Sequence, residues 1–206
     1  MHAHYVSPRL IEEARRNGAD YGVAVDMLAD GRACLRFIDG PTLRPFFREL
    51  TDLAIRLPGM DAEGIALQIV STWTDMQGDD LPAEQGRRWA RLQNETLAED
   101  VRAHPGRFEA MGTLPMQDVG GAIAELDHIV TRLGMRSIEI GTHAAGMELD
   151  HPELRPLWRR IAEHGVFVLL HPPFRPAALD RAGDYFLNNV VSFPLDTTFA
   201  AARLLF

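Results

Sequence analysis

Residues 166–173, with the sequence VFVLLHPP, form an apolar run that stops abruptly at His171 and two prolines. A short apolar run rich in β-branched residues is typical of a strand that is buried on both faces. His171 is therefore predicted to lie at the carboxyl end of a central strand, where α/β barrels and open α/β sheets carry their chemistry. The alternative interpretation is that His171 only caps a core strand through a hydrogen bond to a neighbouring carbonyl group.

A second histidine feature lies at the start of the chain, where one residue separates His2 from His4. In an extended segment these two side chains project from the same side, so both rings can reach one metal ion. Together with His171 they predict a three-imidazole metal site built from two strand ends. Only Met1 precedes the pair, so the strand that should lead into it is expected to be missing. Taken alone, the pair is also compatible with a tag remnant or an accident of the start site.

Composition predicts an ordinary globular protein. The chain has 206 residues, of which 46% are hydrophobic and 24% are charged, so it can bury a full core as a single domain. Its formal charge of −8 argues against nucleic acid and against anionic membranes as partners, because both need a basic surface.

The single cysteine, Cys34, has no internal disulfide partner and is interpreted as a small buried apolar residue in a reducing compartment. No apolar segment approaches the roughly 20 residues that span a bilayer. The amino terminus lacks the charged-then-apolar order of a signal peptide. We therefore expect a cytoplasmic protein.

The segment of about residues 20–40 is predicted to be a β-hairpin inserted into the main fold. Its two strand-like runs, residues 21–25 and 33–38, flank the turn pair Asp30-Gly31. Excursions of this kind often cover a functional site.

From residue 42 onward, strand-like and helix-like patterns alternate. Strands are predicted at residues 65–70, 108–114, 136–140 and 166–170, and helical patterns run through residues 46–54, 89–101, 118–133 and 154–161. A further strand is predicted within residues 185–193, and a helical pattern ends the chain. The alternation predicts βα units and a parallel sheet.

Two architectures contain such units: a doubly wound sheet and a (β/α)₈ barrel. The sequence contains neither of the Gly-rich phosphate loops that usually mark nucleotide-binding doubly wound sheets, which favours the barrel. In a barrel the strand ends share one mouth, so His4, Thr72, Met116, His143 and His171 are all expected to line it. The strand count falls short of eight.

Four segments of the chain resemble the amidohydrolase-2 family. They are the His2-Ala3-His4 triplet, residues 106–117 with the sequence GRFEAMGTLPMQ, the segment IGTH at residues 140–143, and residues 167–172 with the sequence FVLLHP. Within that family the chain is most similar to the aminocarboxymuconate semialdehyde decarboxylases and related metal-dependent, non-oxidative decarboxylases.

The resemblance implies a distorted TIM barrel of the metal-dependent-hydrolase type. It implies that His2, His4 and His171 bind the metal together with an aspartate of the eighth strand. It also implies a catalytic acid–base histidine in an A-H-G-G segment after the sixth strand. Neither segment occurs in the 206 residues, so both groups are expected beyond Phe206, and the catalytic residue within this chain is unknown. Residues 1–206 are thus expected to form an incomplete barrel that lacks the first strand and strands 6–8.

Three residues are candidates for substrate binding. Arg36 of the hairpin is a candidate partner for a substrate carboxylate, although a solvated strand arginine is equally compatible. His143 follows a strand end, where a purely structural hydrogen bond is the alternative. Pro173 stands where the decarboxylases have an aromatic substrate-contacting residue, and Phe174 beside it is expected to compensate.

These features predict a metal-dependent decarboxylase of a small unsaturated or aromatic carboxylate. The alternatives are an amidohydrolase or lactonase of the same superfamily and a catalytically silent metal-binding fragment. Zn²⁺ is the expected cofactor, and Mn²⁺ or another divalent metal also suits imidazole ligands. Because an open barrel leaves strand edges unpaired, a homo-oligomer, most simply a dimer, is expected.

Overall fold

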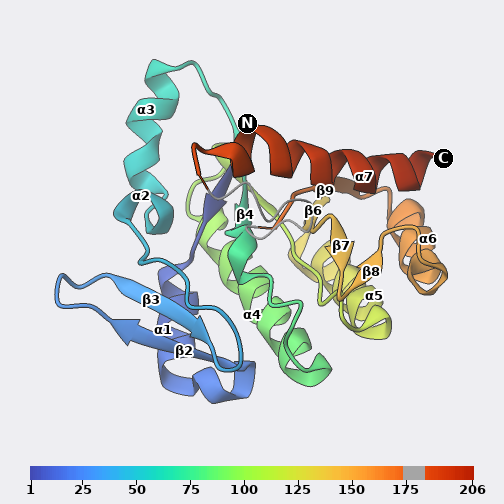
Figure 1. The fold of residues 1–206 in the computed structure, drawn as a ribbon. Helices are drawn as coiled ribbons and strands as arrows, with labels where there is room; N and C mark the ends of the chain where they lie inside the picture. The colour runs from blue at the N-terminus through green and yellow to red at the C-terminus, as the bar shows by residue number, and fades with distance from the viewer. Residues whose placement is uncertain (174–183) are drawn as a thin grey trace.

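The computed structural model describes residues 1–173 and 184–206, which form a parallel sheet with helices packed against it (Figure 1). The parallel strands are β1 (His2–Tyr5), β4 (Gln68–Thr72), β5 (Phe108–Met111), β6 (Ser137–Ile140) and β9 (Phe167–Leu170). The neighbours are β1 with β4, β4 with β5, and β6 with β9, while a parallel bridge between Gly112 and Ile138 links β5 to β6. This order confirms the predicted sequence of parallel strands among the described residues.

The expectation that the first strand is missing is wrong. His2 and His4 lie inside β1, which pairs in parallel with β4 so that His4 stands opposite Ser71. The backbone N–H of Ile69 also donates to the carbonyl oxygen of Met1 at 2.7 Å. A strand needs only enough residues to complete its ladder, and this one begins at the histidine pair itself.

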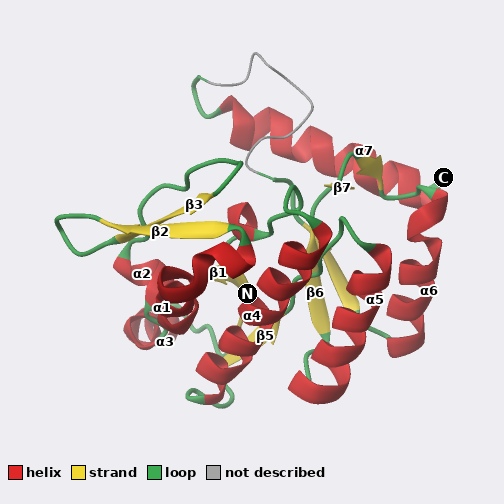
Figure 2. Cartoon of the chain, turned by 90° about the horizontal axis from the view of Figure 1, so that it is seen from below, coloured by secondary structure: helices red, strands yellow, loops and turns green. Residues whose placement is uncertain are grey.

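The connecting helices are amphipathic, and Figure 2 shows α4 (Ala83–Arg102), α5 (Val119–His128) and α6 (Arg155–His164) side by side on one face of the sheet. A π-helical turn, Ile129–Leu133, extends α5 and ends at Gly134, whose φ is 75°. Gly165 ends α6 in the same left-handed conformation, with φ 64°. Glycine adopts this backbone conformation without strain, so both chain reversals occur at glycines.

The predicted hairpin is present as β2 (Val23–Met27) and β3 (Ala33–Phe37), which pair in antiparallel register with Val23 opposite Phe37. It packs against α1 (Pro8–Asn17) in a shared apolar cluster that also includes Trp89 of α4. The hairpin is therefore fixed to the helical layer.

The single helix predicted through residues 46–54 is wrong, because the chain there forms only short helices. These are α2 (Arg48–Thr51) and α3 (Leu57–Ala62), with a single 3₁₀ turn between them. Asp52 is extended, with φ −133° and ψ 107°, and its carboxylate accepts the backbone N–H of Ala54 at 3.0 Å. An aspartate in this position caps a new helical turn and so interrupts the old one.

The strand predicted within residues 185–193 is also wrong. Residues Asn188–Ser192 form a π-helical turn that leads directly into α7 (Phe193–Leu205). Short apolar runs do not distinguish a strand from a buried helix, whereas Pro194 in the first turn of α7 favours helix initiation. The expected carboxyl-terminal helix is present.

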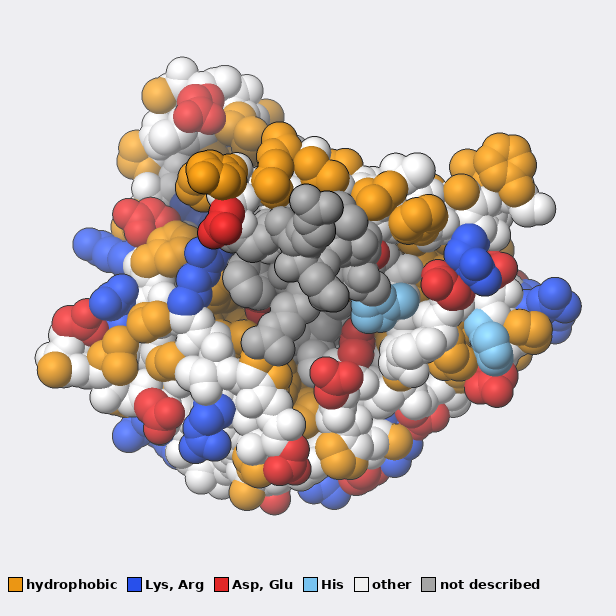
Figure 3. Space-filling view, viewed as in Figure 1, with side chains coloured by type: hydrophobic (Ala, Val, Ile, Leu, Met, Phe, Trp, Pro, Cys, Tyr) orange, Lys and Arg blue, Asp and Glu red, His pale blue; other side chains and the backbone are white. Residues whose placement is uncertain are grey.

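The described residues form an α/β fold with an open sheet, in which β1 and β9 are the edge strands. The prediction that the strand before His171 is central and buried on both faces is wrong for the described residues, because β9 pairs only with β6 and its Phe167 is 61% exposed. Figure 3 shows hydrophobic side chains along α7. Phe199 and Leu205 of this helix are exposed. Within residues 1–173 and 184–206, no helix combines the length and apolar character that a membrane crossing requires.

Candidate metal centre

The three histidines singled out from the sequence converge near the carboxyl ends of β4 and β9. The ring centroid of His4 lies 5.0 Å from that of His2 and 4.9 Å from that of His171, and the His2 and His171 centroids are 6.2 Å apart. His2 and His4 come from β1, whereas His171 follows β9 at the other edge of the sheet.

This convergence requires a curved sheet. Four strand spacings separate β1 from β9, so in a flat sheet these strands would lie about 19 Å apart. The Nε2 atoms of His4 and His171 are only 3.3 Å apart. The sheet therefore coils strongly enough to bring its two edge strands to a common mouth.

Hydrogen bonds to the Nδ1 atoms orient the rings of His4 and His171. Nδ1 of His4 lies 3.2 Å from Oγ of Ser71, and Nδ1 of His171 lies 3.2 Å from Oγ1 of Thr74 and 2.9 Å from the carbonyl oxygen of Pro172. Metal-binding histidines are usually held in this way, with one ring nitrogen bonded to the protein and the other turned towards the ion. Two nitrogens at about 2.0–2.1 Å from a tetrahedral ion are roughly 3.3 Å apart. The spacing of the two Nε2 atoms fits a metal ion.

A buried carboxylate, Glu139 of β6, joins the histidines and was missed from the sequence. Its side chain is 1% exposed, and its Oε2 lies 3.1 Å from Nε2 of His2. Oε2 accepts the Ser71 hydroxyl at 2.7 Å, and Oε1 accepts the Thr74 hydroxyl at 2.9 Å and the Gln77 amide at 3.3 Å. The available signal was a glutamate between Ile138 and Ile140 in a buried strand, where a charged residue is rare unless it is paired.

The charges of the cluster suit metal binding at neutral pH. Burial lowers the pKa of His4 to about 4, although the nearby Glu139 carboxylate opposes this change. Burial alone would raise the pKa of Glu139, but the hydrogen bond from His2, the neighbouring imidazoles of His4 and His171 and the hydrogen bond from Ser71 hold that pKa below its ordinary value. His4 is therefore neutral and Glu139 is an anion, which are the protonation states that metal binding requires.

The structure places Arg36 within the hairpin, where its Nε lies 3.9 Å from a carboxylate oxygen of Asp26. Its role in substrate binding stays a prediction. Arg44, which sequence reasoning overlooked, has its guanidinium 4.6 Å from the centre of the Trp73 ring. Trp73 directly follows β4, so Arg44 is anchored next to the strand end that carries Thr74.

His143 and Phe174 also stay predictions. His143 begins the small strand β7 (His143–Ala144) just after β6, and its buried Nδ1 has no hydrogen-bond partner among the described residues. Phe174 lies outside the described residues.

Asp79, in the loop after β4, is a further carboxyl group at this end of the sheet. Gly141 directly follows β6. A Cβ atom placed on Gly141 would lie 3.9 Å from Oδ2 of Asp79, so the Asp79 carboxyl group lies close to the carboxyl end of β6. Burial, with a smaller contribution from the charge of Asp80, raises the pKa of Asp79 to about 7. Only the folded loop creates this environment, so the sequence carries no signal for it.

We expect Asp79 to make the protein less stable as the pH rises from about 4 to about 7. In this range the unfolded chain has released the Asp79 proton, whereas the folded chain still holds it. One pKa unit corresponds to about 1.4 kcal/mol, and partial exposure reduces the full effect to about 1–3 kcal/mol. Urea titrations measure the free energies of unfolding of Asp79→Asn and of the wild type at pH 4.5 and at pH 8. Between these pH values, the difference between the two proteins should shift by about 1–3 kcal/mol in favour of Asp79→Asn. Asp80→Asn is the matched control, and an equal gain in both variants would contradict the assignment.

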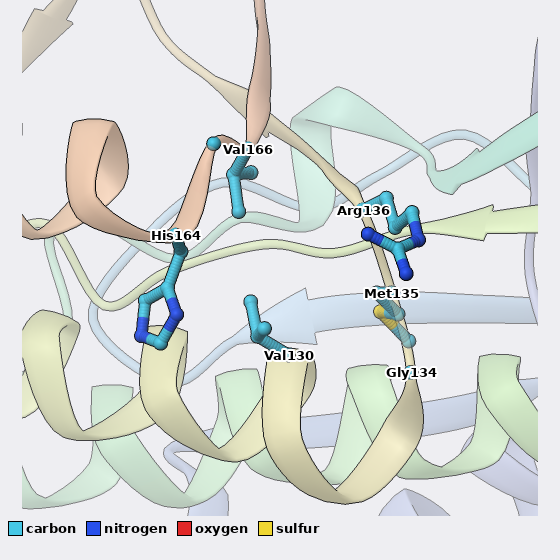
Figure 4. Close-up of a pocket in the computed structure, with 7 residues that line it drawn as sticks. Val130, Gly134, Met135, Arg136, His164 and Val166 are labelled. Carbon is cyan, nitrogen blue, oxygen red and sulfur yellow. The ribbon is translucent and has the colours of Figure 1, made fainter.

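A separate hollow lies at the opposite ends of the strands. Figure 4 shows Val130, Met135, Arg136, His164 and Val166 around it. Arg136 and Val166 directly precede β6 and β9, so this hollow opens at the amino ends of these strands. It is distinct from the histidine cluster.

Comparisons with known proteins identify the family to which the chain belongs. A family model described as amidohydrolase matches residues 1–198. The chain is 27% identical over 206 residues to a 2-amino-3-carboxymuconate-6-semialdehyde decarboxylase of Dictyostelium discoideum, a match that covers 100% of this chain and 57% of the relative.

Two solved structures are similar as well. One is a 2,6-dihydroxybenzoate decarboxylase in complex with 2,6-dihydroxybenzoate, with a TM-score of 0.68 and 29% identity over 76% of this chain and 51% of that one. The other is a dihydroxybenzoic acid decarboxylase of a Polaromonas species with bound manganese and the inhibitor 2-nitroresorcinol, with a TM-score of 0.64 and 26% identity over 75% of this chain and 50% of that one. This chain thus spans about half the length of the relatives it matches. By its sequence match over residues 1–198, the chain belongs to the amidohydrolase family.

Proposed function

We propose that this chain forms the metal-binding part of a divalent-metal-dependent, non-oxidative decarboxylase that acts on an aromatic carboxylate. The observation that carries the proposal is the convergence of His2, His4 and His171 beside a buried carboxylate at the carboxyl ends of parallel strands. Enzymes built on βα units place their catalytic groups at this end. The names of the related proteins support decarboxylation over hydrolysis.

The proposed architecture is part of a (β/α)₈ barrel. The curvature that brings β1 and β9 to one mouth supports it, because a doubly wound sheet would keep its edge strands apart. The further strands would then pair with the open edges of β1 and β9.

The donor set fits several divalent ions. Imidazole nitrogens and a carboxylate oxygen suit both Zn²⁺ and Mn²⁺. We place Mn²⁺ beside Zn²⁺ as a first candidate because a related decarboxylase contains manganese. When bound, the ion supplies positive charge that orients the substrate and stabilises negative charge as the bond to CO₂ breaks.

The chain's own residues would hold the ion and position the substrate. Ser71 and Thr74 fix the orientation of His4 and His171 through their Nδ1 atoms. Arg44, held against Trp73, offers a cation to an acidic group of the substrate. Replacing the carboxylate group with hydrogen also requires one proton at the ring carbon, and the resemblance assigns its delivery to the histidine of an A-H-G-G segment.

We expect the 206-residue chain alone to release CO₂ from 2,6-dihydroxybenzoate very slowly. Loss of a positioned acid–base group typically reduces a rate by about 10²–10⁴-fold. A longer version that includes an A-H-G-G segment should recover this factor, and a chelator should abolish its activity. The assay measures CO₂ release by both versions with Mn²⁺ or Zn²⁺, in parallel with hydrolysis of a lactone and an amide. Fast turnover by the short chain would show that its catalytic group has been misassigned, and hydrolysis without CO₂ release would favour the hydrolase.

A further inference from the structure

We infer that Glu139 is itself a metal ligand, so that this chain supplies three imidazoles and a carboxylate from its own residues. The inference rests on the metal centre of the proposed function and extends it. The possible ligand atoms of His2, His4 and Glu139 all lie within 4.8 Å of one another. His171 approaches the same group through its contact with His4.

The spacing of the donor atoms supports direct coordination. Oε2 of Glu139 lies 3.1 Å from Nε2 of His2, and Nε2 of His4 lies 3.3 Å from Nε2 of His171. Both separations match the distance of roughly 3.3 Å between two ligands of one tetrahedral ion. His4 is adjacent to both His2 and His171, so the two pairs belong to one cluster.

The burial of Glu139 without a basic partner is the stronger argument. Among the described residues, no lysine or arginine lies within ion-pair distance of Glu139, whose only ion-pair contact is with His2. A buried carboxylate is costly unless a cation or a metal compensates it. Glu125 shows the usual solution in this protein, because it is 3% exposed and accepts a hydrogen bond from Arg91 at 2.7 Å and one from Asn94 at 2.8 Å. A divalent ion would compensate the negative charge of Glu139, as Arg91 compensates that of Glu125.

The neighbouring hydroxyl groups hold the carboxylate in place. Ser71 donates to Oε2, and Thr74 donates to Oε1. The same hydroxyls contact the Nδ1 atoms of His4 and His171, so one pair of side chains orients three of the ligands. Shared outer contacts of this kind are characteristic of preorganised metal sites.

Metal titration of the 206-residue chain tests the inference. Isothermal titration with Mn²⁺ or Zn²⁺ should show one tight site in the wild type. Glu139→Gln should lower the metal affinity by more than about 100-fold, because loss of a residue that only hydrogen-bonds to a ligand already lowers metal affinity by about 10–100-fold. Glu125→Gln, which removes an equally buried carboxylate from another part of the fold, should leave the affinity unchanged. The visible spectrum of bound Co²⁺ should also change in Glu139→Gln and not in Glu125→Gln.

Thermal melting provides a second readout that does not depend on activity. Without metal, the melting temperatures of the wild type and Glu139→Gln give the baseline for each protein. Added Mn²⁺ should raise the melting temperature of the wild type and not that of Glu139→Gln. If Glu139→Gln does not fold, Glu139→Asp, which keeps the charge on a shorter side chain, should bind metal more weakly than the wild type.

The outcomes separate this inference from the proposed function. Unchanged metal affinity and an unchanged Co²⁺ spectrum in Glu139→Gln would overturn the inference while leaving the histidine site intact. Failure of the wild-type chain to bind any divalent ion would overturn both.

Discussion

Replacing His171 with alanine is expected to abolish tight binding of Mn²⁺ or Zn²⁺ by this chain. The His171 ring contributes the Nε2 atom that lies 3.3 Å from that of His4, and no other described histidine approaches His4 from β9. Loss of a direct ligand should exceed the roughly 10–100-fold loss that follows removal of a ligand's hydrogen-bond partner. Isothermal titration or equilibrium dialysis measures the change.

His151→Ala is the matched control for His171→Ala. Its Nδ1 accepts only a long hydrogen bond, 3.4 Å, from the backbone N–H of Glu153, so its loss should leave metal affinity unchanged. Equal affinities in the wild type and His171→Ala would contradict the assignment of the metal centre. Equal losses in both variants would point to a general effect of removing histidine.

Trp89→Ala is expected to reduce the free energy of unfolding by about 3–5 kcal/mol, the usual cost of deleting a large buried aromatic side chain. Trp89 is 0% exposed, and its Nε1 donates to the carbonyl oxygen of Met76 at 2.6 Å. Met76 belongs to the loop that carries Thr74 and Gln77 to Glu139. The substitution should therefore also weaken metal binding.

Urea unfolding of Trp89→Ala and Trp89→Phe tests this prediction. The phenylalanine variant keeps most of the apolar contacts and loses the hydrogen bond to Met76, so its loss should be clearly smaller. A loss below about 1 kcal/mol in Trp89→Ala would show that this packing contributes little to stability.

Local patterns predicted most of the secondary structure. The order of the parallel strands and the hairpin near the amino terminus follow from apolar periodicity and turn residues. Such features depend on residues close together in the chain. Where a short apolar run was ambiguous, as in residues 185–193, the prediction was wrong because local preference alone does not choose between strand and helix.

The candidate metal centre was also predicted only in part from the sequence. A histidine pair in an extended segment and a histidine at a strand end are visible in the sequence, and they identified His2, His4 and His171 as candidates. Whether they meet depends on the curvature of the sheet, which is set by packing across all five strands.

The sequence by itself therefore determined most of the elements and which three imidazoles are candidates to bind a metal. Only the tertiary structure brought Glu139 to them. Its contact with Ser71 spans 68 residues of sequence, and its contact with Thr74 spans 65. The shift of the Asp79 pKa to about 7 likewise arises from burial in the folded loop. Long-range contacts and burial exist only after the chain has folded, which is why no local pattern reveals them.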